Sequence, residues 1–132
     1  MLDKGDDSMI KFYSNEIETY YVSIYQSYIT LNKDLLKFLD NAYRVRIGMD
    51  EDEKKVYVFV IDKDKALSGE IEDSELLKLS VSKTYARICS SKLIKYIQDT
   101  FKFEIEANSF KKFSATWNQD LKAIIINILE EL

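Results

Sequence analysis

The sequence predicts an α+β fold that is mostly strand, with two short helices and an internal duplication of one ββαββ unit. Three observations lead to this prediction. Runs of β-branched and aromatic residues alternate with polar residues, as they do in half-buried strands. Two segments space their apolar residues as an amphipathic helix does. The order of these patterns in the first half of the chain recurs in the second half, which is typical of a repeat.

The first unit is expected at residues 10–62, after a flexible tail at residues 1–9 that is acidic and poor in apolar residues. Its patterns predict, in order, strands at 20–25 and 28–31, a helix that begins after the N-cap Asn32, and a hairpin of strands at 43–47 and 56–61. A connector with alternating charge is expected at residues 63–75, and a short helix near residues 72–77 is the alternative.

The second unit is expected at residues 76–132. Leu77, Leu79 and Val81 align with Tyr20, Val22 and Ile24 at an offset of 57. The helix of the second unit aligns at an offset of 58, with Leu93 over Leu35. The expected hairpin aligns Phe101, Phe103 and Ile105 with Tyr43, Val45 and Ile47, and Ile124, Ile126 and Ile128 with Val56, Val58 and Val60 at an offset of 68. A ten-residue insertion that covers residues 110–117 separates these two strands and has room for a strand of its own.

Composition excludes most familiar enzyme chemistry. The 132 residues contain no histidine and no proline, and only three glycines, so histidine-dependent triads, histidine-containing zinc sites and a glycine-rich phosphate loop are all absent. The single cysteine excludes an internal disulfide and is typical of a reducing compartment. We expect a cytoplasmic, non-enzymatic protein with no cofactor, no metal site and no membrane association.

The order of elements in residues 29–39, 43–47 and 56–60 resembles the AbrB/MazE/SpoVT family of DNA-binding domains. The resemblance implies a swapped-hairpin barrel, in which two such units interlock. Two copies in one chain imply a pseudo-dimer within a monomer, or a homodimer of such chains. The resemblance also implies that the first strand of a unit, the loop after it and the short strand face DNA.

Positive charge gathers in the second unit. The segment from Leu76 to Gln98 carries five basic residues and no acid, a charge of +5 in a chain whose net charge is -4. On the surface implied by the resemblance, Lys78, Lys83, Arg87 and Lys92 would contact DNA phosphates, with Ser80, Ser82 and Thr84 as neutral donors. A solvated strand face with acidic partners from elsewhere in the fold is the alternative interpretation of this charge.

The function predicted is that of a small, transcription-regulator-like protein that binds double-stranded DNA. The alternative is a protein-interaction module, antitoxin-like or an accessory protein of a mobile element, that kept the fold without DNA binding. The acidic remainder of the chain favours this alternative, as does the absence of the family's Gly-Arg pair before the short strand, where Gln26-Ser27 and Lys83-Thr84 stand. A third hypothesis is binding of RNA or another single strand, whose bases would stack on exposed tyrosines, although strand tyrosines more often cover a sheet face. Five of the nine tyrosines lie in or near the first unit, namely Tyr13, Tyr21, Tyr25, Tyr28 and Tyr57.

Three further features have simpler interpretations. The acidic run at residues 50–53 is expected to be a solvated hairpin turn rather than a cation site. Cys89 is expected to be a small, partly buried core thiol, because no histidine is present to activate it. Trp117 is expected to serve in packing.

Overall fold

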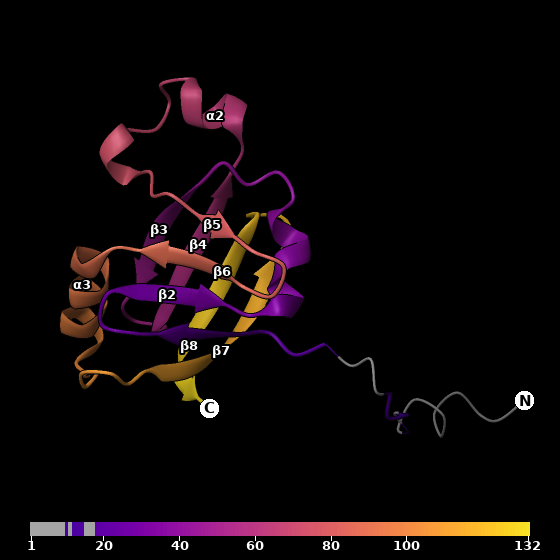
Figure 1. Ribbon diagram of the computed structural model, residues 1–132, viewed down its shortest axis with the longest axis vertical. Helices are drawn as coiled ribbons and strands as arrows, with labels where there is room; N and C mark the ends of the chain where they lie inside the picture. Colours follow the sequence, from indigo (N-terminus) through magenta and orange to yellow (C-terminus); the bar gives the residue numbers. More distant parts are fainter. Residues whose placement is uncertain (1–9, 11, 15–17) are drawn as a thin grey trace, which may run out of the picture.

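The chain folds around one sheet of eight antiparallel strands (Figure 1). The computed structural model describes residues 10, 12–14 and 18–132; the expected tail at residues 1–9 lies outside them. The elements, in chain order, are β1 (Tyr21–Ile24), β2 (Tyr28–Leu31), the 3-10 helix η1 (Lys33–Leu39), β3 (Arg44–Asp50), β4 (Lys55–Ile61), α2 (Lys63–Leu67), the 3-10 helix η2 (Asp73–Glu75), β5 (Ser80–Val81), β6 (Ala86–Cys89), α3 (Ser91–Phe101), β7 (Lys111–Asn118) and β8 (Ala123–Glu131).

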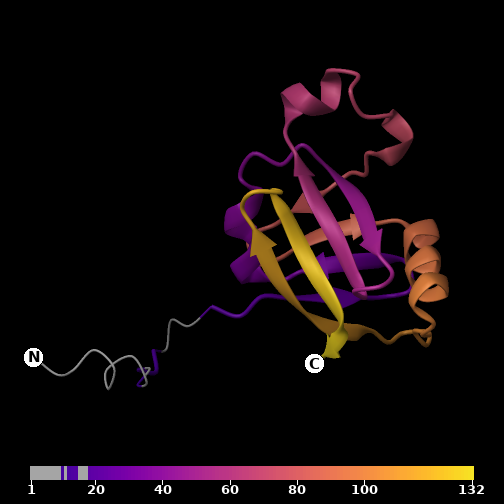
Figure 2. The same ribbon diagram turned by 180° about the vertical axis from the view of Figure 1, so that it is seen from behind.

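The sheet curls back on itself. Its strand order is β3-β4-β8-β7-β1-β2-β6-β5, so the two halves of the chain interleave. At the open side, Val45 of β3 and Leu77, just before β5, exchange two backbone hydrogen bonds of 2.9 and 2.8 Å. The β3–β4 and β7–β8 hairpins cross behind β2 and β6 in Figure 1 and in front of them in Figure 2, with α3 at one side of the sheet and η1 at the other. The predicted α+β class, mostly strand, is confirmed.

The strong strand alternation explains how the core forms. In β1 and β2 every second residue is fully buried, namely Val22, Ile24, Ile29 and Leu31. These side chains join one apolar cluster with residues from both helices that flank the sheet, including Leu35 of η1 and Ile94 of α3. Each fully buried aliphatic side chain of this size stabilises the fold by about 1.5–3 kcal/mol. The core is therefore shared by both halves of the chain.

Helix α3 begins and ends with recognisable caps. The Ser90 hydroxyl accepts a hydrogen bond of 3.1 Å from the Leu93 amide, and Lys102 closes the helix in the left-handed region at φ 60°. The helix faces the core with Ile94, Ile97 and Phe101, which lie on one face at helical spacing.

The expected strand at Phe101, Phe103 and Ile105 is wrong. Phe101 belongs to the apolar face of α3, and residues 102–110 form a loop. Two glutamine side chains form hydrogen bonds with the backbone of this loop. The side-chain oxygen of Gln98 accepts from the Ile105 amide at 2.8 Å, and the side-chain nitrogen of Gln26 donates to the Ile105 carbonyl at 2.8 Å. The hairpin partner of β8 is instead β7, at the position assigned to the insertion. The residues that the second half has in addition to the first therefore lie before β7, in the loop at residues 102–110.

Two other segments differ in detail. The strand expected to include Leu77, Leu79 and Val81 is reduced to Ser80–Val81 and the bridge at Leu77. The connector contains two short helices, α2 and η2; the second matches the alternative of a short helix near residues 72–77. Ile61, Ala66 and Ile71 form a small apolar cluster of their own beneath it.

Most of the strand pairing recurs when each strand is exchanged for the one four places later in the chain. The exception is the β1–β7 ladder, whose counterpart between β5 and β3 is reduced to the Val45–Leu77 bridge. Ser23 pairs with Thr30, and Ser80 pairs with Arg87, which are the same positions displaced by 57. Val56 pairs with Ile126 and Val58 with Ile124, which are the same positions displaced by 68. Thr30 pairs directly with Arg87, its own counterpart at the displacement of 57. This pair therefore joins the two halves of the chain.

The two hairpin turns repeat the same construction. In the β3–β4 turn the Asp50 carboxylate accepts from the Glu53 amide at 3.0 Å, and in the β7–β8 turn the Asn118 side chain accepts from the Leu121 amide at 2.9 Å. Lys54 and Lys122 end these turns with φ 58° and 51°. The carbonyl of each accepts a 2.9 Å hydrogen bond from the opposite hairpin, from Ile128 and Val60 respectively. The solvated turn expected at residues 50–53 is confirmed.

None of the helices in the described part of the chain combines the length and the apolar character needed to cross a bilayer.

Because both turns hold a lysine in the left-handed region, Lys54→Gly and Lys122→Gly should each raise the free energy of unfolding by about 0.5–1 kcal/mol. Urea denaturation measures the effect. Asp52→Gly, in the same turn but without a positive φ, is the control and should lower stability. A loss of stability in both lysine variants would contradict the described turn geometry.

Candidate nucleic-acid interface

The outer face of the sheet carries a row of polar side chains across five neighbouring strands. Cross-strand pairing places Lys112 of β7 beside Ser23, Ser23 beside Thr30, Thr30 beside Arg87, and Arg87 beside Ser80. Their chain neighbours on β1, β2 and β6 are buried, so the period of two turns these side chains outward. We call these five residues the polar row.

Arg87 stands at the centre of this face between two tyrosines. Its guanidinium carbon lies 4.3 Å from the centroid of the Tyr28 ring and 5.4 Å from that of Tyr85. Its Nε is buried and has no hydrogen-bond partner among the described residues. Stacking of this kind contributes about 0.5–2 kcal/mol and fixes the plane of the guanidinium. The side chain is therefore held in place without a carboxylate, which leaves its charge unneutralised.

Other aromatic rings extend this face. Tyr25 stacks on Tyr28 at 4.4 Å and lies 5.1 Å from Phe110, and the Lys112 ammonium lies 4.3 Å from the centroid of the Tyr21 ring. These rings pack on one another and on cations along the strands. They cover the sheet face, in agreement with the more common role of strand tyrosines.

An acidic residue near the polar row comes from outside its five strands: Asp34 of η1 lines a pocket together with Ser23 and Thr30. The strands β7, β1, β2, β6 and β5 contain no aspartate or glutamate. The three ion pairs between described residues are Lys37–Glu18, Arg46–Glu75 and Lys111–Glu131, so none of the four predicted contact residues is paired within residues 18–132. The alternative interpretation, with a carboxylate beside each basic residue, finds no support in this part of the chain.

The four predicted residues do not form one cluster. Lys83 lies in the β5–β6 turn, where the Ser82 hydroxyl accepts from the Tyr85 amide at 3.2 Å, whereas Lys92 lies in the first turn of α3, beyond the other end of β6. The rise of a strand, roughly 3.3 Å per residue, separates the two by on the order of 20 Å. Lys78 precedes β5, and Arg87 lies between the two ends. The four residues follow the length of β6, and the three lysines are exposed.

Ser23 and Thr30 lie in the two strands of the first unit that the resemblance places against DNA, whereas the sequence did not indicate Lys112 as a member of this face. Thr30 lies beside Arg87, and Lys112 beside Ser23, through pairing between strands far apart in the chain. Lys112 lies in β7, whose position was assigned to an insertion. Lys92 is also unfavourably placed for the stability of α3, because a cation at a helix N-terminus opposes the partial positive charge there.

Cys89 is exposed, so the expectation of a partly buried core thiol is wrong. Ala86 and Ile88 point into the core, and the period of two therefore turns Arg87 and Cys89 outward. Cys89 pairs with Tyr28 on the same face as Arg87.

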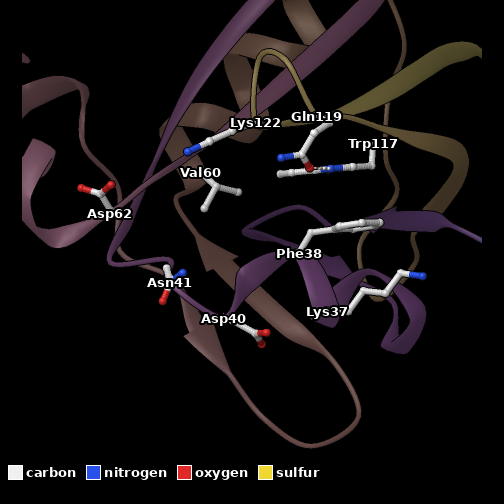
Figure 3. Close-up of a pocket in the computed structure, with 9 residues that line it drawn as sticks. All are labelled: Lys37, Phe38, Asp40, Asn41, Val60, Asp62, Trp117, Gln119 and Lys122. Carbon is white, nitrogen blue, oxygen red and sulfur yellow. Dashed lines mark hydrogen bonds between the residues drawn. The ribbon is translucent and has the colours of Figure 1, made fainter.

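A pocket of about 260 Å³ lies beside η1, and Figure 3 shows its lining residues between Phe38 and the β7–β8 turn. The Trp117 indole stacks on Phe38 at 4.5 Å with an interplanar angle of 6°, and its N–H donates to Gln119 at 2.9 Å. Trp117 therefore serves in packing, as expected. The charged groups around the pocket are of both signs, and the described residues hold no group of three or more potential metal ligands.

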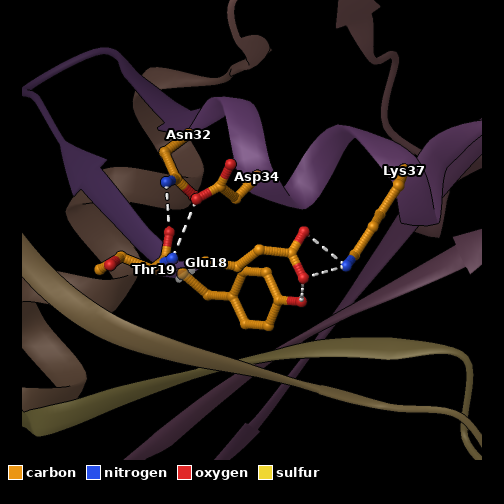
Figure 4. A network of polar contacts seen from close by, with 6 residues as sticks. Glu18, Thr19, Asn32, Asp34 and Lys37 are labelled. Atoms are coloured by element: carbon orange, nitrogen blue, oxygen red, sulfur yellow. Dashed lines mark hydrogen bonds and ion pairs between the residues drawn. The ribbon is translucent and has the colours of Figure 1, made fainter. Parts of the chain in front are cut away.

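Figure 4 shows polar contacts that fasten the chain where it enters β1. The Asp34 carboxylate accepts from the Thr19 amide at 2.9 Å, and the Asn32 side chain donates to the Thr19 carbonyl at 2.6 Å. Nearby, hydrogen bonds to Glu18 and Tyr20 raise the pKa of Lys37 above its usual 10.5. A raised lysine pKa stabilises the fold at lower pH, and this stabilisation is lost only as the pH rises through the pKa of the folded state. The contribution of this contact to stability is therefore constant around neutral pH.

Comparison of the chain with protein-family models, curated proteins and solved structures found no match.

Lys92→Glu should raise the free energy of unfolding by about 1 kcal/mol, because it replaces a cation with an anion at the N-terminus of α3. Thermal or urea denaturation measures this. The matched control is Lys95→Glu, an exposed lysine one turn further along the same helix, where we expect a change below about 0.3 kcal/mol. Equal gains in the two variants would contradict the dipole argument.

Proposed function

We propose that this protein binds double-stranded DNA without catalysing a reaction, in the manner of a small cytoplasmic transcription regulator. The observation that carries the proposal is the face built around Arg87, where basic and hydroxyl side chains lie together and none of the five strands β7, β1, β2, β6 and β5 contains an acidic residue. Lysine and arginine neutralise phosphates and release counterions, and serine and threonine hydroxyls donate to phosphate oxygens.

The strand pairing supports a second part of the proposal, that the chain is an internal duplication. We infer that residues 10–62 and 76–132 descend from one ββαββ unit and form a pseudo-dimer related to the swapped-hairpin barrel of the AbrB/MazE/SpoVT family. The register displaced by 57 in the short strands and by 68 in the hairpins favours common descent. The two turns, each closed by a lysine of positive φ, favour it as well.

The connector favours a second candidate function. Residues 62–75 project from the sheet as a separate lobe and carry six acidic residues against two lysines (Figure 1). An acidic lobe of this kind can bind a basic protein partner, as the protein-interaction hypothesis requires. This function and DNA binding use different faces of the chain.

The DNA hypothesis predicts a strong salt dependence. With four cations on phosphates, log K should fall with log salt concentration at a slope of about -4. Fluorescence anisotropy with a labelled duplex of about 20 base pairs, titrated between about 50 and 200 mM salt, measures this slope. The double variant Lys83→Ala/Arg87→Ala should reduce its magnitude by about two and weaken binding correspondingly.

Lys65→Ala is the matched control, because Lys65 is an exposed lysine on α2, away from the proposed face. Its slope should equal that of the unchanged protein. Binding that persists undiminished in the double variant removes the proposed site. Absence of DNA retention at low salt, together with one stoichiometric protein partner whose binding is lost when Glu70 and Glu72 become glutamine, selects the protein-interaction function instead.

A further inference from the structure

The two halves of the chain correspond in strand pairing but not in charge. The positions displaced by 57 or 58 from the four predicted contact residues are neutral or acidic: Lys78 corresponds to Tyr21, Lys83 to Gln26, Arg87 to Thr30 and Lys92 to Asp34. The segment 76–98 has a charge of +5. The corresponding segment 19–40 has none, because Lys33 and Lys37 are offset by Asp34 and Asp40.

The side chains at these positions of the first half take part in contacts within the protein. Gln26 donates to the carbonyl of Ile105 at 2.8 Å and holds the loop after α3. Asp34 accepts from the Thr19 amide at 2.9 Å, as Figure 4 shows. The Tyr21 ring lies beneath the Lys112 ammonium at 4.3 Å. These three side chains are committed to the fold.

Their counterparts in the second half are not committed in this way. Lys78, Lys83 and Lys92 are exposed and take no part in the ion pairs among residues 18–132. Lys92 also lies at the end of α3 where a cation is least favourable. A basic residue that does not contribute to folding is available to a ligand.

We infer that the protein binds duplex DNA mainly through its second half, residues 76–132, as a single chain in one orientation, and that its target lacks two-fold symmetry. This inference rests on the proposed DNA-binding function. Two-fold symmetric regulators read palindromic half-sites because both subunits present the same contacts. Among these four pairs of corresponding positions only the second half carries cations, so the predicted phosphate contacts gather on residues 78–92. Lys112, which belongs to the second half as well, lies beside β1, and the first half supplies a tyrosine-covered, largely neutral surface.

Amide NMR of the full-length protein tests this inference without knowledge of the target sequence. An arbitrary duplex of about 20 base pairs is titrated at about 50 mM salt, where phosphate contacts dominate binding. We expect shifts of the Lys78, Lys83, Arg87 and Lys92 amides, and little change at Tyr21, Gln26 and Asp34. Shifts of equal size in both sets overturn the one-sided inference and leave DNA binding in place. No shifts in either set overturn the proposed function as well.

Charge-matched variants separate position from net charge. Lys83→Gln gives both loops a glutamine and should weaken duplex binding about fivefold near 0.1 M salt. Adding Gln26→Lys to this variant restores the original net charge but places it in the first half. One-sided binding predicts that the affinity stays low in the double variant, whereas recovery to the original affinity overturns the inference. Amide spectra of both variants without DNA verify that the fold is retained.

Discussion

The pairing of β2 with β6 is the constraint on which the rest of the structure depends. It joins the two halves of the chain at the Thr30–Arg87 pair and turns Ile29 and Ile88 into the common core. The same register turns Arg87 outward between two tyrosine rings. One set of backbone hydrogen bonds thus determines both the continuity of the core and the position of the central cation. A slip of one residue would exchange the buried and exposed faces of both strands.

The fold and the proposed interface place opposite demands on the two halves. In the first half, polar side chains stabilise the structure: they fasten the chain before β1 and hold the loop after α3. In the second half, the corresponding positions carry cations that contribute nothing comparable, and Lys92 opposes the helix dipole. Sites that destabilise a fold slightly are often retained for binding. The difference in charge between halves of similar construction is the pattern expected when one half serves the fold and the other serves a ligand.

Much of the fold could be predicted from sequence because alternation in short strands is a local signal. Tyr21–Ile24, Tyr28–Leu31 and Lys55–Ile61 were predicted almost at their observed bounds. The strand expected at residues 101–105 failed because Phe101 satisfies the period of α3 as well as that of a strand, and helical continuation buries it. Arg87 could be found from its charge, whereas the placement of Thr30 beside it, and of Lys112 beside Ser23, depends on pairing between distant strands. Cys89 was misjudged from residue type, although its position one residue after Ile88 sets its outward direction.

The single cysteine allows the most direct measurement of the central claim. Cys89 is exposed and lies on the outer face beside Tyr28, two residues from Arg87. A photoactivatable crosslinker attached to Cys89 should form covalent adducts with duplex DNA at low salt. The same reagent on Ser68→Cys, in a Cys89→Ser background, places the crosslinker on the acidic connector and should give almost none. Equal crosslinking from the two positions, or crosslinking from the connector alone, would contradict the account.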